Sequence, residues 1–219
     1  NSFNNLEINN SAGLTINTGG DIEVTGNLLL TNGLINTSLT GTLKLKNTSA
    51  NCVFPSGGSA SSYISGPLTK TINQYEEFLF PVGTVKAGLQ YILGNRIKVS
   101  STQSGPAEWT AEYFSPNPTS SNINAPLVAV SSQEYWNLKT ISGSQSLISL
   151  GWTPSSDITP LVVGGLSNVR VAHYDSGTSK WLEVPTTATG DNYYGTAVSS
   201  VLQTSNGSDN FTLASISSL

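Results

Sequence analysis

The sequence predicts an all-β protein in which a short N-terminal parallel β-helix or solenoid-like repeat region is packed on, or followed by, an antiparallel β-sandwich. Apolar and polar residues alternate with a period of two over many short stretches of the 219 residues, which is typical of strands with one buried face. Clusters of Gly, Asn, Ser and Pro separate these stretches, and no helical pattern extends beyond a turn or two. We expect the repeat region to span residues 1–56 and the sandwich to span residues 57–219.

The repeat region consists of pairs of apolar residues that flank one polar residue and recur at intervals of roughly eight residues. The pairs are Leu6/Ile8, Leu14/Ile16, Ile22/Val24, Leu28/Leu30 and Leu43/Leu45. In a solenoid the first four pairs would point inward, whereas the alternative is an antiparallel meander with a hairpin turn at Asn32-Gly33. We favour the solenoid. Because two coils alone are marginally stable, we expect either the following domain to cap them or further coils to precede Asn1 in a longer protein.

The sequence changes character after the repeats. Residues 55–62 form a loop of small residues, and Gly66-Pro67 marks a turn. Longer strands at wider spacing favour a sandwich, and the clearest hairpin turns through Asp175 and Gly177. We expect strands near residues 68–72, 77–81, 89–99, 108–114, 135–141, 146–152, 167–174, 180–184, 196–202 and 210–216.

The predicted core of the sandwich is rich in aromatic residues. Inward and outward positions alternate along each expected strand, and the inward set contains three of the four tryptophans. The expected core residues are Trp109, Ala111, Tyr113, Trp136, Leu138, Ile148, Leu150, Trp152, Val169 and Val171. A chain of this size needs no disulfide, and we expect its single cysteine, Cys52, to be a buried thiol.

The composition argues against several functions. Hydrophobic residues make up 37% of the chain and charged residues 10%, which is too apolar and too weakly charged for disorder. The formal net charge is −4 with no cluster of Lys or Arg, so nucleic acid is not an expected partner. No stretch reaches the ~18 apolar residues of a membrane-spanning helix. A surface of Ser, Thr and Asn suits a secreted all-β protein.

Several runs of residues resemble modules of large secreted or cell-surface proteins of the Bacteroidetes type. Residues 3–17 and 21–35 are similar to a repeat of these proteins. Residues 62–70 and 78–83 are similar to the segment that commonly follows the repeat, and residues 209–215 resemble the last strand of the module. The resemblance implies a long protein with neighbouring domains, exported by the type IX secretion route to the cell surface or the medium. It brings no catalytic motif to this chain.

Catalysis is not expected. The single histidine, His173, shares a strand face with Val169 and Val171, and we interpret it as a structural residue rather than a general base. No Gly-x-Ser-x-Gly elbow is present. Glu108 and Glu112 share a strand face, but at ~3.3 Å per residue their Cα atoms lie about 13 Å apart, beyond the ~5–9.5 Å that separates the carboxyl groups of glycosidases.

Neither a metal ion nor a cofactor is expected. The sequence contains no His/Cys cluster, and Asp175 and Asp191 each stand alone in a Gly-containing loop, where we interpret them as turn formers. Gly57-Gly58 and Gly164-Gly165 belong to no phosphate-binding pattern.

Carbohydrate is the ligand class with the most support. Trp181 and the pair Tyr193-Tyr194 lie near expected turns, where an exposed aromatic ring can stack on a sugar. Adjacent residues of a strand point in opposite directions, so one of the two tyrosines would face solvent if this stretch is extended. Trp181, Tyr193 and Tyr194 are therefore candidate ligand-binding residues, and the alternative is that they cover the edge of the core.

Three functions are considered. The sequence favours a non-catalytic structural or adhesive module of a large bacterial cell-surface or secreted protein, with the solenoid as a spacer. The alternative is a carbohydrate-binding module attached to a polysaccharide-degrading or adhesive parent protein, with a polysaccharide or another extracellular ligand as its partner. A third option is an enzyme whose acidic residues assemble from distant strands.

Overall fold

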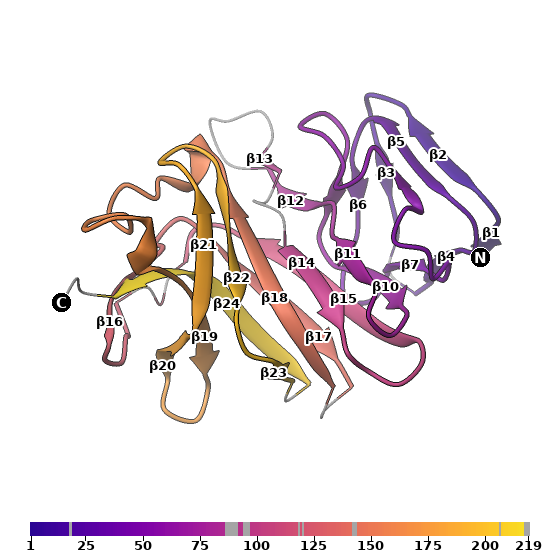
Figure 1. Cartoon of the computed structure of the whole chain (residues 1–219). Coiled ribbons are helices and arrows are strands. Elements are labelled where there is room, and N and C mark those ends of the chain that lie inside the picture. The colour runs from indigo at the N-terminus through magenta and orange to yellow at the C-terminus, as the bar shows by residue number, and fades with distance from the viewer. Residues whose placement is uncertain are drawn as a thin grey trace.

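The computed structural model describes residues 1–17, 19–85, 92–93, 97–117, 119, 121–141, 144–205 and 207–216. The chain is all-β, and a parallel solenoid of about four turns leads into antiparallel sheets, which confirms the expected fold class (Figure 1). The solenoid contains the N-terminal strands at one end of the molecule, and the C-terminal end of the last strand lies at the other end (Figure 1).

The solenoid has three parallel ladders, one on each of its faces. The first contains β1 (Ser2–Phe3), β4 (Ile22–Val24), β7 (Leu43–Leu45) and β10 (Leu68–Ile72). The second contains β2 (Leu6–Asn9), β5 (Leu28–Asn32) and β8 (Val53–Phe54). The third contains β3 (Leu14–Thr15), β6 (Ile35–Asn36), β9 (Ile64–Ser65) and β12 (Val82–Thr84), with β13 (Ile92–Leu93) antiparallel at its edge.

Apolar residues of successive coils lie above one another. Leu6 is opposite Leu28, which is in turn opposite Val53, and the other two ladders stack in the same way. Each coil therefore buries its inward side chains on the neighbouring coils. The inward residues expected from the sequence are buried or pack on the core: Leu6, Ile8, Leu14, Ile16, Ile22, Val24, Leu28 and Leu30.

The antiparallel meander is wrong, because Asn32-Gly33 forms a corner between β5 and β6 of one coil rather than a hairpin turn. Gly33 has a φ of 95°, and a Cβ atom there would lie 1.8 Å from the carbonyl oxygen of Asn10. The corner therefore needs glycine both for its backbone conformation and for the close approach of two coils.

The sandwich consists of two antiparallel sheets. One contains β10, β15 (Ala107–Phe114), β17 (Tyr135–Thr140), β24 (Ser208–Ile216), β19 (Val169–Asp175) and β20 (Lys180–Val184), with β16 (Leu127–Val130) also paired to β24. The other contains β11 (Glu77–Leu79), β14 (Ile97–Ser101), β18 (Gln145–Trp152), β22 (Gly195–Ser199) and β21 (Thr186–Gly190), with β23 (Gln203–Thr204) paired to β18. Two short 3-10 helices, η1 (Pro154–Ser156) and η2 (Leu166–Asn168), lie between β18 and β19.

Strand β10 belongs to both parts of the molecule. It pairs with β7 of the solenoid in parallel and with β15 of the sandwich in antiparallel orientation, so one ten-stranded sheet continues from the first coil to β20. A single apolar cluster fills the interior of both parts, from Ile8 to Leu213. It contains all ten residues that the sequence predicts for the sandwich core.

Parallel pairing continues past residue 56, through β9, β10 and β12. Pairing alone does not determine whether each part folds by itself, so the expected division into residues 1–56 and 57–219 stays a prediction. The expected strand over residues 89–99 lies partly outside the described residues, and within the described part it corresponds to β13 and β14.

Candidate functional site

Tyr193 and Tyr194 lie at the tip of the hairpin that joins β21 to β22. Their side chains are 65% and 61% exposed. The Asp191 carboxylate fixes the tip, because one oxygen accepts hydrogen bonds from the backbone N–H groups of Tyr193 (2.7 Å) and Tyr194 (2.8 Å). These two bonds lower the pKa of Asp191. The tip therefore presents two exposed rings on a fixed backbone, whereas ligand binding by them stays a prediction.

Trp181 does not have the exposure that the sequence suggests. Its side chain is only 1% exposed, and its indole Nε1 donates a hydrogen bond to the carbonyl of Thr119 at 3.2 Å. A small second core covers it, which contains Leu127, Val130, Ala172 and Ala214. Trp181 does follow the predicted turn through Asp175 and Gly177. It is buried because a segment from about 60 residues earlier in the chain covers it, and the local sequence does not reveal that contact. Trp181 therefore offers no ring to a ligand.

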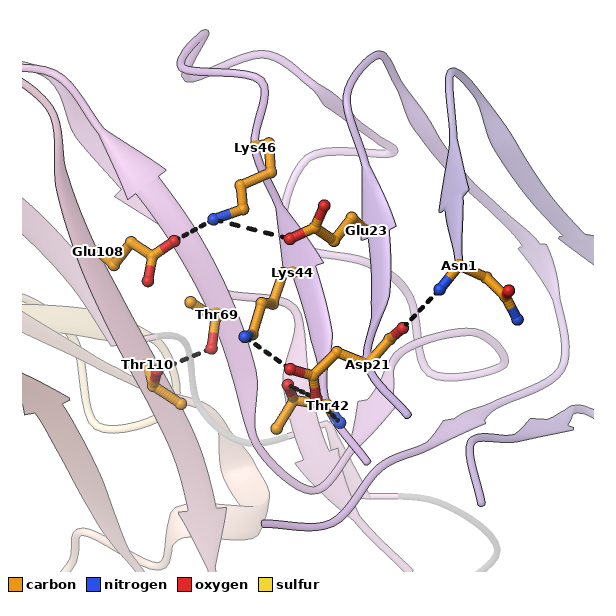
Figure 2. A network of polar contacts seen from close by, with 9 residues as sticks. All are labelled: Asn1, Asp21, Glu23, Thr42, Lys44, Lys46, Thr69, Glu108 and Thr110. Atoms are coloured by element: carbon orange, nitrogen blue, oxygen red, sulfur yellow. Dashed lines mark hydrogen bonds and ion pairs between the residues drawn. The ribbon is translucent and has the colours of Figure 1, made fainter. Parts of the chain in front are cut away.

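A polar network crosses the outer face of the ten-stranded sheet where the solenoid meets the sandwich (Figure 2). Lys46 follows β7 and reaches across β10 to form an ion pair with Glu108 of β15. The same ammonium group lies 3.9 Å from Glu23 of β4. The hydroxyl groups of Thr69 and Thr110 lie 2.8 Å apart and link β10 to β15. The network therefore joins side chains from both parts of the molecule.

A second ion pair lies within the solenoid, next to this network (Figure 2). The Nζ atom of Lys44 lies 2.6 Å from Oδ2 of Asp21. The other carboxylate oxygen of Asp21 accepts hydrogen bonds from the hydroxyl (2.7 Å) and the backbone N–H (3.1 Å) of Thr42. The bond from Lys44, followed by those from Thr42, lowers the pKa of Asp21 to about 2. Its carboxylate is therefore charged at neutral pH and holds neighbouring coils together.

Within the described part of the chain, His173 forms an ion pair with one acidic residue, Asp209. The Nε2 atom of His173 lies 2.9 Å from Oδ1 of Asp209, and the His173 ring stacks on Phe211 with centroids 5.1 Å apart. The Ser205 hydroxyl donates a hydrogen bond of 2.9 Å to Oδ2 of Asp209. The carboxylate thus lies between the hydroxyl and the imidazole, whereas a nucleophilic serine needs the base next to it. This arrangement supports a structural role for His173, and the absence of catalysis stays a prediction.

A small crevice opens beside this cluster, between the two sheets. Trp109, Ser146 and Asp209 are among the residues that line it. The Trp109 indole N–H is buried and has no hydrogen-bond partner among the described residues. The crevice has room for about one water molecule and is far smaller than a typical ligand pocket, so ordered water suits it better than an organic ligand.

Lys70 is a buried charge that the sequence analysis missed. It lies on β10 between Leu45 and Trp109 in register, with its side chain in the core. Its Nζ donates to the carbonyls of Asn47 and Thr71, and lies 5.1 Å from the centroid of the Phe78 ring. The alternation along β10 did indicate an inward position, but a lysine there was not expected to be buried.

Burial affects the ionisation of both polar groups in this region. Desolvation lowers the pKa of Lys70 and raises the pKa of the Cys52 thiol. Cys52 is fully buried, as expected. A thiol with a raised pKa inside the solenoid is unreactive until this part of the chain opens.

The described residues contain no group of three or more His, Cys, Asp or Glu side chains that is suited to a metal ion. Asp175 accepts hydrogen bonds from the backbone N–H of Gly177 (3.0 Å) and the hydroxyl of Thr178 (2.7 Å), which is how a turn-forming aspartate binds. In the same part of the chain no helix is long and apolar enough to cross a bilayer.

A comparison of the chain with protein-family models, curated proteins and solved structures found no match.

Proposed function

We propose that the chain is a non-catalytic structural or adhesive module of a large bacterial cell-surface or secreted protein. In this role the solenoid and the sandwich act as one rigid spacer between neighbouring domains. The resemblance of residues 3–17 and 21–35 to repeats of type IX secretion cargo supports a location outside the cell or on its surface.

The observation that carries this proposal is the sheet shared through β10. Adjacent modules joined by a linker move relative to one another, whereas two parts that share a central strand and a core resist bending. Lys46 and Glu108 add an ion pair across the shared strand. The polar, weakly charged composition of the surface suits a protein exposed to salt and proteases, because few of its contacts depend on screened charges.

Antibody labelling of the source cells tests the location. Antibodies raised against the folded chain should label intact cells or detect the protein in the medium. Labelling that requires permeabilised cells would contradict the proposal.

Limited proteolysis tests the rigid spacer. With a non-specific protease under native conditions, we expect cleavage near the chain ends and survival of a core that extends from the solenoid into the sandwich, because both parts share backbone hydrogen bonds and apolar contacts. Rapid cleavage between β8 and β10, with release of a stable sandwich, would contradict a single rigid module.

Carbohydrate binding is the second candidate function, and the exposed hairpin tip favours it. Two tyrosines held by Asp191 form a preorganised aromatic surface, which lowers the entropic cost of binding. If this tip binds glycans, Tyr193→Ala or Tyr194→Ala should abolish binding on a glycan array. Binding that survives both substitutions would remove the tip from consideration.

A further inference from the structure

Four side chains form a straight row across the outer face of the large sheet. Glu112 on β15 is opposite Asn137 on β17, Asn137 is opposite Asn210 on β24, and Asn210 is opposite Tyr174 on β19. Neighbouring residues such as Trp136 point into the core, so the row faces the other side. At ~4.8 Å between strands, the row is about 14 Å long. We call these four residues the cross-strand row.

Glu112 begins the row with a carboxylate that is partly removed from water. It is half-buried, and among the described residues it has no hydrogen bond or ion pair, whereas Glu108 on the same face is paired with Lys46. Burial raises the pKa of Glu112, and burial together with the charge of Glu112 raises the pKa of the Tyr135 hydroxyl. Water still reaches this carboxylate, because neither of its oxygens is among the buried side-chain atoms that lack a partner. A ligand hydroxyl can therefore donate a hydrogen bond to it in place of water.

The middle of the row is held in place by its neighbours. The Asn137 side-chain amide donates to Asn210 Oδ1 at 2.7 Å and to the Ser208 hydroxyl at 3.0 Å. These bonds leave the side-chain N–H₂ of Asn210 as a donor without a partner among the described residues. Phe114 and Tyr135 stack beside the row, with ring centroids 4.8 Å apart and an angle of 9° between the rings. The surface therefore combines an acceptor, a donor and a fixed aromatic pair.

The charges on this surface argue for a neutral ligand. Lys139 is exposed on the same face of β17, two residues from Asn137. Its positive charge balances the negative charge of Glu112. A purely cationic partner would meet the lysine, and a purely anionic partner would meet the glutamate. A ligand with many hydroxyl groups suits both, since each hydroxyl donates to a carboxylate and accepts from an amide or ammonium group.

We propose that the cross-strand row binds a neutral carbohydrate chain that lies across β15, β17 and β24 and ends at Tyr174, whose ring packs on Trp181. Glu112 accepts hydrogen bonds from sugar hydroxyl groups, the Asn210 amide donates one, and the Phe114–Tyr135 pair provides an apolar flank. The inference rests on the second candidate function and moves its site from the hairpin tip to the face of the large sheet.

Affinity electrophoresis in native gels containing a soluble neutral polysaccharide (β-glucan, xylan or galactomannan) tests this inference. The whole chain should be retarded by at least one of the three. Glu112→Gln and Asn210→Ala should each weaken binding about tenfold or more, because each removes a hydrogen bond to the ligand and the first also removes a charge. Glu77→Gln is the matched control, since Glu77 is an exposed carboxylate paired with Lys98 on the other sheet, and it should bind like the wild type.

Thermal unfolding of the same variants separates binding from folding. Glu112→Gln should unfold at or above the wild-type temperature, because glutamine keeps the shape of the side chain and removes a half-buried charge. Lost binding with retained stability supports the site. If Glu112→Gln binds like the wild type and Tyr194→Ala loses binding, the proposal for the cross-strand row is wrong and the hairpin tip is the sugar site. No retardation of the wild type by any of the three polysaccharides would overturn the row and the second candidate function together, and would leave the structural role untouched.

Discussion

Lys70 shows at the scale of one residue how the two parts of the molecule are joined. Its position on β10 continues an inward column that contains Val24 and Leu45 in the preceding coils. The ammonium group is satisfied by backbone carbonyls and an aromatic ring rather than by a carboxylate. A buried cation without a counter-ion costs stability even when it is hydrogen-bonded.

We predict that Lys70→Met changes the pH dependence of stability. The pKa of Lys70 is lowered in the folded state, so between that pKa and the unfolded value of 10.5 the unfolded chain binds more protons and wild-type stability rises with pH. The variant should be as stable as the wild type or about 1 kcal/mol more stable at pH 7. In urea titrations, the free energy of unfolding of the wild type should increase relative to that of the variant as the pH approaches 10. A difference that does not change with pH would contradict a destabilising buried charge.

Gly33 provides a second prediction at this scale. Gly33→Ala should destabilise the chain by about 2 kcal/mol or more, since alanine is strained at a positive φ and its Cβ would overlap the Asn10 carbonyl. Gly20→Ala in the same coil is the control, because a Cβ there meets no atom within 4 Å. Equal effects of the two substitutions in urea unfolding would contradict the stacked corner.

At the scale of elements, successive solenoid strands are joined by polar contacts on the outside as well as apolar contacts on the inside. The Asp21–Lys44 pair links the segment before β4 to β7, and Thr42 adds two bonds to the same carboxylate. These contacts are partly exposed, so each contributes modestly. They matter for register, because a coil that slipped by one residue would lose them and would turn its apolar residues outward.

We predict that Asp21→Asn reduces the acid sensitivity of the chain. The folded pKa of Asp21 is about 2 against an ordinary value of 3.8, so its contribution is complete above pH 4 and is lost as the pH falls from about 4 to 2. At pH 7 the substitution should cost about 1 kcal/mol or less, because the pair is partly exposed. Urea unfolding at pH 7 and pH 3 should therefore show a smaller loss in the variant than in the wild type. An equal loss would mean that Asp21 does not stabilise the solenoid through its charge.

The sequence predicts the elements well where the hydrophobic pattern is local. Alternation alone identifies the inward residues of the first coils and the sandwich core around Trp109 and Trp136, because each strand carries its own period of two. It does not reveal that β10 pairs with both the solenoid and the sandwich, since pairing partners are set by tertiary packing. The same limit explains the burial of Trp181.

The candidate surfaces depend on register even more strongly. Glu112 and Asn210 are nearly 100 residues apart in the sequence, and only the pairing of β15, β17 and β24 brings them into one row. The hairpin tip, by contrast, was predictable because its residues are adjacent. Local chemistry can therefore be inferred from a sequence of this kind, but a site built across strands cannot.

At the scale of the whole molecule, the central claim is that the solenoid and the sandwich form one cooperative unit. They share β10, a ten-stranded sheet and an apolar core. A protein built in this way should unfold in one step, because loss of either part exposes the apolar surface of the other.

Side chains of the protein itself can report the unfolding of each part separately. Its single cysteine, Cys52, is buried in the solenoid, and all four tryptophans lie beyond β10 in the sandwich. The most direct measurement follows both during urea unfolding at equilibrium, with thiol labelling of Cys52 for the solenoid and tryptophan emission for the sandwich. One cooperative unit predicts that the two midpoints coincide. Labelling of Cys52 at urea concentrations where tryptophan emission is still native would show that the solenoid opens alone, and would contradict the claim.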